Sequence, residues 1–234
     1  MQKLGVGFSQ YDWLPRRNDG VCFALSSKWV TKTLLGGNLN RSYHFERTDK
    51  GRAPKEKLDK YNAKQDAYVQ LAESKAKKIA ADQGAKETDL SVAELYDAVY
   101  EAESELADSW AQAIALKQSR GIKLRSSRDC PSLNWWARSE GDLDSDFALI
   151  YSFYYESSTC CGMRKHSGSH SVAFVAIGGK ARYFDPNAGE FFFLEVDDGG
   201  TMEQWLASVD REIARQYVRK GSLEHSVVHH IIAS

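Results

Sequence analysis

Three residues in this sequence have the types needed for nucleophilic catalysis: Cys22 early in the chain, and His170 and Asp185 late in it. Cys22 follows the turn-forming run 18–20 and lies at the start of a helical pattern of apolar residues. With Asp19 as the N-cap, Cys22 falls in the first helical turn. The unpaired N–H groups and the dipole of that turn favour a thiolate, the nucleophilic form of cysteine. The alternative is a buried structural cysteine on a core-facing helix.

The histidine and the aspartate are brought together by an expected hairpin. His170 opens a predicted strand over 170–177, and Asp185 ends the next one, over 181–185. Gly178-Gly179 forms the turn between them, so the outer ends of the two strands lie side by side. A carboxylate beside an imidazole fixes its tautomer and stabilises the imidazolium. Packing the cysteine against this pair would complete a nucleophile, a base and its orienter.

Amide side chains upstream of Cys22 are candidates for an oxyanion hole, because acyl transfer needs donors for the developing negative charge. Asn18 is the nearest and Gln10 is second. Asn18 also suits the structural role of holding its own backbone in the Asn-Asp-Gly turn.

The remaining pattern predicts helices first and an antiparallel sheet afterwards, which is an α+β fold. Helices are expected after Cys22, over 55–82, over 91–118 and over 201–219, where Thr201 and Gln204 form a capping box. Strands are expected over 147–155, 170–177, 181–185, 190–196 and 225–232. We expect one domain, 1–234, with a charged helical insertion over 46–128. The insertion either docks a partner or is a solvated helical hairpin that covers the core.

Composition excludes several classes of function. The 234 residues carry a net charge of −1, and the locally basic run 117–128 lacks interleaved aromatic residues. We therefore expect a surface loop or a contact with an acidic partner there, and no nucleic-acid partner. No apolar run reaches the length of a membrane span, and residues 1–8 lack the apolar stretch of a cleaved signal peptide. We expect no integral membrane segment and favour a monomer made in a reducing cytoplasm.

Other cysteines and histidines do not have the spacing of a metal site. Cys160 and Cys161 are adjacent, unlike the usual zinc-binding pairs, and we expect them on a mobile loop that includes His166. The histidines near the C-terminus are expected at the surface or on an edge strand: His225, His229 and His230. Trp135-Trp136 is expected to be a core or interface anchor. We therefore expect no metal and no cofactor.

The order of these motifs resembles papain-like cysteine proteases, and specifically the YopT-like group of bacterial effectors. The matching segments are 20–26 with Trp29, 170–174 and 184–191. The resemblance implies a papain-like fold with Cys22 as nucleophile, His170 as general base and acid and Asp185 as its orienter; it does not reach 46–128. It further implies a protease that is secreted without a cleaved signal peptide and cuts a specific host protein in the host cell cytoplasm.

Two other classes of function stay open on the same residues. A triad of this kind also serves acyltransferases and amidases, such as transglutaminase-like or peptidoglycan-cleaving proteins, because the acceptor decides the outcome. Alternatively, the triad is idle and the charged insertion makes the protein a binding module.

Overall fold

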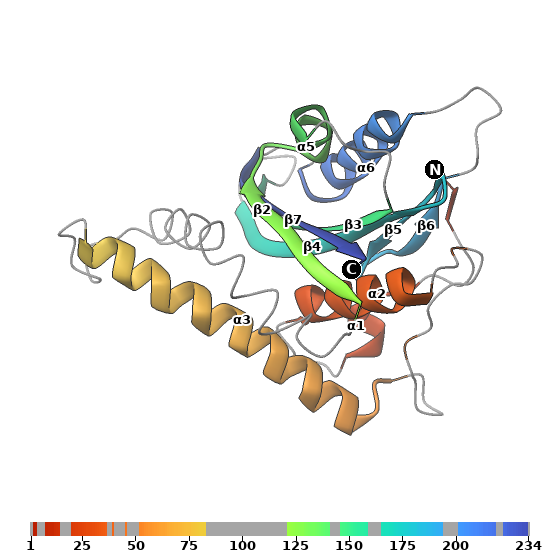
Figure 1. Cartoon of the computed structure of the whole chain (residues 1–234). Coiled ribbons are helices and arrows are strands. Elements are labelled where there is room, and N and C mark those ends of the chain that lie inside the picture. The colour runs from red at the N-terminus through yellow and green to blue at the C-terminus, as the bar shows by residue number, and fades with distance from the viewer. Residues whose placement is uncertain are drawn as a thin grey trace.

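The computed structural model describes residues 2–3, 8–14, 20–36, 39, 45, 52–82, 121–140, 146–158, 165–193, 201–218 and 222–233. In this part of the chain, seven antiparallel strands form one sheet in the order β1-β6-β5-β4-β3-β7-β2, with helices on both faces (Figure 1). The elements in chain order are β1 (Gln2–Lys3), α1 (Gln10–Trp13), α2 (Cys22–Gly36), α3 (Lys55–Asp82), β2 (Ile122–Asp129), α5 (Leu133–Glu140), β3 (Phe147–Ser158), β4 (Lys165–Ile177), β5 (Lys180–Asp185), β6 (Gly189–Phe192), α6 (Met202–Tyr217) and β7 (Ser222–Ala233). The predicted α+β class is confirmed.

Helix α2 covers one face of the sheet, and the period-two alternation of the strands supplies its partners. The apolar residues on this face form one core cluster with the helix: Ile122, Leu124, Ala148, Ile150, Ala173, Val175, Phe184 and Ile231. Trp29 of α2 stacks on Phe184 of β5, with ring centroids 5.4 Å apart. This packing fixes α2 against the middle strands and therefore fixes where its first residue lies.

Helices α5 and α6 cover the opposite face. The alternate residues of the same strands point there, among them Phe153, Val172 and Phe174, and they pack on Trp136 of α5 and Tyr217 of α6. The two helices are joined by Asp210 of α6, whose carboxylate accepts the backbone N–H groups at the start of α5, of Leu133 at 3.0 Å and of Asn134 at 2.8 Å. A carboxylate there satisfies orphan donors and the positive end of the helix dipole.

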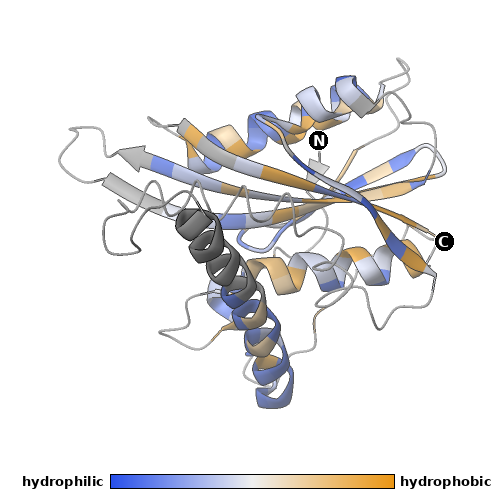
Figure 2. Ribbon diagram, turned by 60° about the vertical axis from the view of Figure 1, so that its left-hand side comes forward, coloured by the Kyte–Doolittle hydropathy of each residue, from blue (hydrophilic) through white to orange (hydrophobic). Residues whose placement is uncertain are grey.

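Helix α3 runs over the residues predicted for it and projects from the body of the molecule (Figure 1). Figure 2 shows mostly hydrophilic residues along its coloured part and hydrophobic ones along the middle of the sheet. The second expected helix, 91–118, lies outside the described residues. None of the described helices has the length and apolar character that crossing a bilayer requires.

The end of the expected insertion is a correction. Residues 122–128, assigned above to the insertion and to a surface loop, form most of β2 and pair with β7 in the central sheet. Ile122 and Leu124 are buried, whereas Lys123 and Arg125, the residues that alternate with them, are exposed. A count of charges along the run misses this half-buried strand, because it ignores the alternation of buried and exposed positions.

The structure also changes one other predicted strand boundary and the predicted place of the last strand. β4 starts at Lys165 rather than His170, because residues 165–169 continue the ladder with β3. β7 lies between β3 and β2, so it is not an edge strand. His229 and His230 are consequently buried on opposite faces of the sheet, against Phe23 and Trp136 respectively. The prediction that they lie at the surface or on an edge strand is therefore wrong. Trp136 is a core residue as predicted, while Trp135 is 47% exposed.

Candidate active site

The first turn of α2 carries Cys22, a free cysteine that is partly exposed. The Val21 carbonyl accepts the first intrahelical bond, from the Leu25 N–H at 2.9 Å, so Val21 is the N-cap. Asp19 was the expected N-cap; the helix begins two residues later than that role would require, and Cys22 is its first residue. The sulfur therefore lies at the positive end of the helix dipole, as the sequence predicts.

Contacts from three directions hold this helix end. The Val21 N–H donates to Gln10 Oε1 at 3.0 Å, and the Ala24 N–H donates to Gln65 Oε1 of α3 at 3.4 Å. On the sheet side, Ser26 Oγ donates to the Ser171 carbonyl of β4 at 3.0 Å. The last bond joins α2, which begins with Cys22, to the residue beside His170 on β4.

His170 lies where β4 is paired with β3 but its ladder with β5 has ended. It is opposite Phe153 on β3, whereas the β4–β5 pairs run from Ile177–Lys180 only to Ala173–Phe184. Nε2 of His170 hydrogen-bonds Asp185 Oδ1 at 2.9 Å, and both side chains are almost fully buried. The expected neighbour relation across the hairpin is thus present in the structure.

Asp185 is completely buried and accepts several hydrogen bonds besides the one to the imidazole. Its Oδ1 accepts the Asn187 N–H at 2.8 Å, and the Tyr217 hydroxyl lies 3.0 Å from Oδ1 and 2.9 Å from Oδ2. The Tyr183 hydroxyl is 3.4 Å from Oδ2. A buried carboxylate needs such donors in place of water. They also hold it at the angle that orients His170.

The electrostatics of the pair favour a thiolate beside an imidazolium. Burial on its own lowers the pKa of His170, but the charge and hydrogen bond of Asp185, together with those of Cys22, raise it well above its ordinary value. Burial raises the pKa of Cys22, yet the hydrogen bond and charge of His170 and the backbone hydrogen bonds of Ser171 and Phe23 lower it overall. Since Nε2 faces Asp185, Nδ1 is the nitrogen that remains for Cys22. A lowered thiol pKa favours the thiolate, the nucleophilic form of cysteine.

Three residues of the candidate site are not among the predicted ones, and two of them contact the His170 ring. The Tyr217 ring lies against His170, with centroids 4.8 Å apart, and Phe153 meets the imidazole edge to face at 5.7 Å. Helical spacing places Tyr217 on the inward face of α6, but nothing in the sequence says that this end of α6 lies over Asp185.

Asn187 is the other unpredicted residue, although it lies in the segment 184–191 that resembles the YopT-like group. Its Oδ1 accepts from Gln10 Nε2 at 2.7 Å, and its Nδ2 donates to the Tyr217 hydroxyl at 3.0 Å. It therefore links the segment before Cys22 to the groups around Asp185.

Of the predicted oxyanion candidates, Gln10 reaches the site and Asn18 lies outside the described residues. Gln10 is buried, and its backbone N–H also donates to the Pro186 carbonyl at 2.6 Å. Its amide oxygen and one amide hydrogen are used by Val21 and Asn187, which leaves a second amide hydrogen to offer a substrate.

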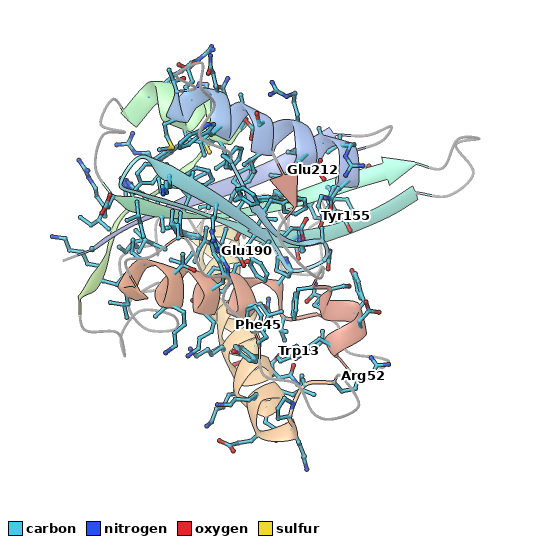
Figure 3. The ribbon with its side chains drawn as sticks, turned by 90° about the vertical axis from the view of Figure 1, so that its right-hand side faces the viewer. Trp13, Phe45, Arg52, Tyr155, Glu190 and Glu212 are labelled. Carbon is cyan, nitrogen blue, oxygen red and sulfur yellow. The ribbon has the colours of Figure 1, made fainter. Side chains whose placement is uncertain are left out.

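Helix α1, which carries Gln10, is held from its other end by the segment that leads into α3. Arg52 donates to the carbonyl of Asp12 at 2.8 Å and to that of Leu14 at 2.7 Å, and the Ala53 N–H donates to the Trp13 carbonyl at 2.8 Å. Figure 3 shows Trp13, Phe45 and Arg52 near one another on this side of the sheet, with Tyr155 at the level of the strands.

The described residues contain no group of three or more metal-ligating side chains. Cys160 and Cys161 lie outside those residues, as does the side chain of His166. Cys130 is buried in the core cluster that includes α5.

No protein-family model matches the chain, and no curated protein matches it in sequence. Among solved structures, it is similar to the crystal structure of the avirulence protein AvrPphB of Pseudomonas. The TM-score is 0.45 at 12% sequence identity, and the match covers 92% of each chain.

Proposed function

We propose that the protein is a papain-like cysteine endopeptidase that uses Cys22, His170 and Asp185 as its catalytic triad. The observation that carries the proposal is the position of His170, which hydrogen-bonds Asp185 Oδ1 at 2.9 Å and lies close enough to Cys22 to lower the pKa of its thiol. A thiol, an imidazole and a carboxylate in this order are the parts that acyl transfer through a cysteine requires.

The chemistry follows from the groups present. The Cys22 thiolate attacks a peptide carbonyl, and the electron pair of the C=O bond moves to oxygen, where the Cys22 N–H and the second Gln10 amide hydrogen stabilise it. His170, charged at the start, gives its proton to the leaving amine. Neutral His170 then takes a proton from water as the water oxygen attacks the thioester, and the C–S bond breaks to release the acid and regenerate the Cys22 thiolate beside the imidazolium. Asp185 stabilises the imidazolium through its hydrogen bond to Nε2. Each proton moves between His170, the substrate and water.

The substrate class rests on the resemblance of the motifs around Cys22, His170 and Asp185 to YopT-like effectors. We propose a specific host protein as the substrate, cut in the host cytoplasm after secretion without a cleaved signal peptide. The test is to incubate host lysate with the wild-type protein or with Cys22→Ala and to search for new protein N-termini. New termini in a small number of proteins, formed only by the wild type, are expected. Their absence in lysate where Cys22 remains reactive would refute an endopeptidase.

Adding a primary amine to the same incubation separates hydrolysis from acyl transfer. The endopeptidase proposal expects cleaved products whether or not the amine is present. Products that carry the amine without cleavage would replace it with an acyltransferase. An electrophilic epoxide probe tests the alternative of a binding module with an idle triad. We expect labelling at Cys22, and folded protein that fails to label would show that the triad is inactive.

A further inference from the structure

Helix α1 is a single turn whose position depends on contacts with other segments. It has four residues, Gln10–Trp13, and an isolated helix of that length is not stable in water. Its first residue carries the amide hydrogen that the proposed mechanism places at the oxyanion. The direction of that hydrogen is therefore set by whatever holds the two ends of the helix.

The end of α1 is held by the guanidinium group of Arg52. Its Nη1 donates to the Asp12 carbonyl at 2.8 Å and to the Leu14 carbonyl at 2.7 Å, and the Tyr11 carbonyl lies 3.5 Å from the same nitrogen. A helix leaves its last four carbonyl groups without partners inside the helix. A cation at this place also interacts favourably with the negative end of the helix dipole.

The fourth of these carbonyl groups, that of Trp13, accepts from the Ala53 N–H at 2.8 Å. The Trp13 ring is completely buried and meets Tyr61 of α3 edge to face, with centroids 5.6 Å apart. Figure 3 shows the labelled Arg52 and Trp13 near one another on this side of the sheet. Two successive residues of the predicted insertion thus bind all four terminal carbonyl groups of α1.

The start of α1 is held by the active site. The backbone N–H of Gln10 donates to the Pro186 carbonyl at 2.6 Å, and its side-chain amide bonds the Val21 N–H at 3.0 Å and Asn187 Oδ1 at 2.7 Å. A helix of four residues is about 6 Å long, so a shift at its far end reaches Gln10 almost undiminished. A misplacement of about 1 Å can slow a catalysed step about 100-fold.

We propose that Arg52 is a positioning residue for the oxyanion donor: it holds the end of α1 and thereby keeps the second amide hydrogen of Gln10 aimed at the substrate carbonyl oxygen. This inference rests on the proposed function. As the bond between sulfur and carbon forms, the C=O electron pair moves onto oxygen, and Gln10 stabilises that oxygen by a hydrogen bond without giving up its proton. Arg52 lies in the predicted insertion 46–128, so the base of the insertion would belong to the machinery of the site.

The test compares two reactions of Cys22, of which only one forms an oxyanion. Acylation by p-nitrophenyl acetate passes through a tetrahedral oxyanion, whereas alkylation by iodoacetamide displaces iodide without one. We expect Arg52→Met to slow acylation about 5- to 50-fold, less than the loss of about 100-fold or more that removing an oxyanion donor causes. Alkylation should stay within about two-fold, because the thiolate itself is not altered.

Three further variants make the comparison specific. Arg52→Lys keeps a cation and donors at the carbonyl groups, so it should lose less of the acylation rate than Arg52→Met. In a Gln10→Ala background, Arg52→Met should change acylation by less than about two-fold, because residues that act through one another have non-additive effects. Arg138→Met removes an exposed arginine of α5 that pairs with Glu203 of α6, and it should change neither rate.

Each other outcome contradicts the inference. Unchanged acylation in folded Arg52→Met means that the guanidinium does not position the donor. An equal fall in both reactions, or failure of Arg52→Met to fold, makes Arg52 a structural residue, and an undiminished effect in the Gln10→Ala background means that it does not act through Gln10. These results leave the proposed function intact, whereas a wild type without acylation that depends on Cys22 removes the proposed function and this inference together.

Discussion

Replacing Asp185 with asparagine removes the charge of the site and keeps the size and shape of the side chain. His170 Nε2 and the Asn187 N–H would still find an oxygen, since both lie near Oδ1, at 2.9 and 2.8 Å. An amide nitrogen in place of Oδ2 would face the hydroxyl groups of Tyr217 and Tyr183, which can accept hydrogen bonds. We therefore expect Asp185→Asn to fold, with a loss in free energy of unfolding of about 1–3 kcal/mol from the weaker, uncharged hydrogen bonds.

The effect on the imidazole is larger. The charge of Asp185 is the leading cause that raises the pKa of His170 against burial, which lowers it. An opposite charge at this range typically shifts a pKa by about 1–3 units, and each unit lost by His170 lowers the ratio of the thiolate–imidazolium pair to the neutral thiol–imidazole pair tenfold. The imidazolium in turn stabilises the Cys22 thiolate. The rate of alkylation at neutral pH is therefore expected to fall about 10- to 1,000-fold in Asp185→Asn.

The assay is the rate of iodoacetamide alkylation of Cys22 as a function of pH, with thermal melting as the check of folding. An ordinary thiol titrates at pH ~8.5. The wild type should react at pH values well below this, and Asp185→Asn should react only as the pH approaches it. Asp210→Asn is the matched control, because it removes a partly buried carboxylate of α6 that accepts the N–H groups at the start of α5, away from Cys22. Wild-type reactivity at about pH 6 in folded Asp185→Asn would refute the role assigned to the carboxylate.

Three further predictions follow from single contacts. Cys22→Ala should abolish turnover and leave the melting temperature nearly unchanged, because the side chain is partly exposed; a large fall would make the cysteine structural. Tyr217→Phe should cost about 1–3 kcal/mol of unfolding free energy and reduce kcat more than KM, because a hydrogen bond to the buried Asp185 is lost. A variant with the wild-type free energy of unfolding in denaturant and wild-type kinetics would contradict this prediction. Burial lowers the pKa of His229 from 6.5 to about 4, so the unfolded chain binds the extra proton between these values and stability decreases as pH falls through them, by roughly 3 kcal/mol. His229→Gln should flatten the dependence of unfolding free energy on pH in this interval, and an equally steep dependence in that variant would assign it to other groups.

The sequence identifies the parts of the site that depend on local pattern. Gly178-Gly179 sets the register of the hairpin, and the register brings His170 to Asp185. Helical periodicity gives the bounds of α3, and the Thr201–Gln204 capping box gives the start of α6. These signals are local because turn chemistry and caps act within a few residues.

The parts that sequence reasoning misses depend on which elements meet in space. Tyr217 reaches Asp185 only because the end of α6 lies over the start of the β5–β6 turn, and no local signal specifies that contact. The β2 strand is missed because its polar side chains face solvent, and His229 is buried because β7 is an inner strand, which depends on the pairing order of the whole sheet.

The hydrogen bond between Gln10 and Asn187 joins residues 177 positions apart in the chain. Closing a loop of that length costs conformational entropy, which the assembled sheet and its covering helices repay. We therefore expect a partly folded chain to carry the thiol of Cys22 without the contacts of His170 that lower its pKa. Alkylation of Cys22 would then report completion of the fold more sharply than helix content does.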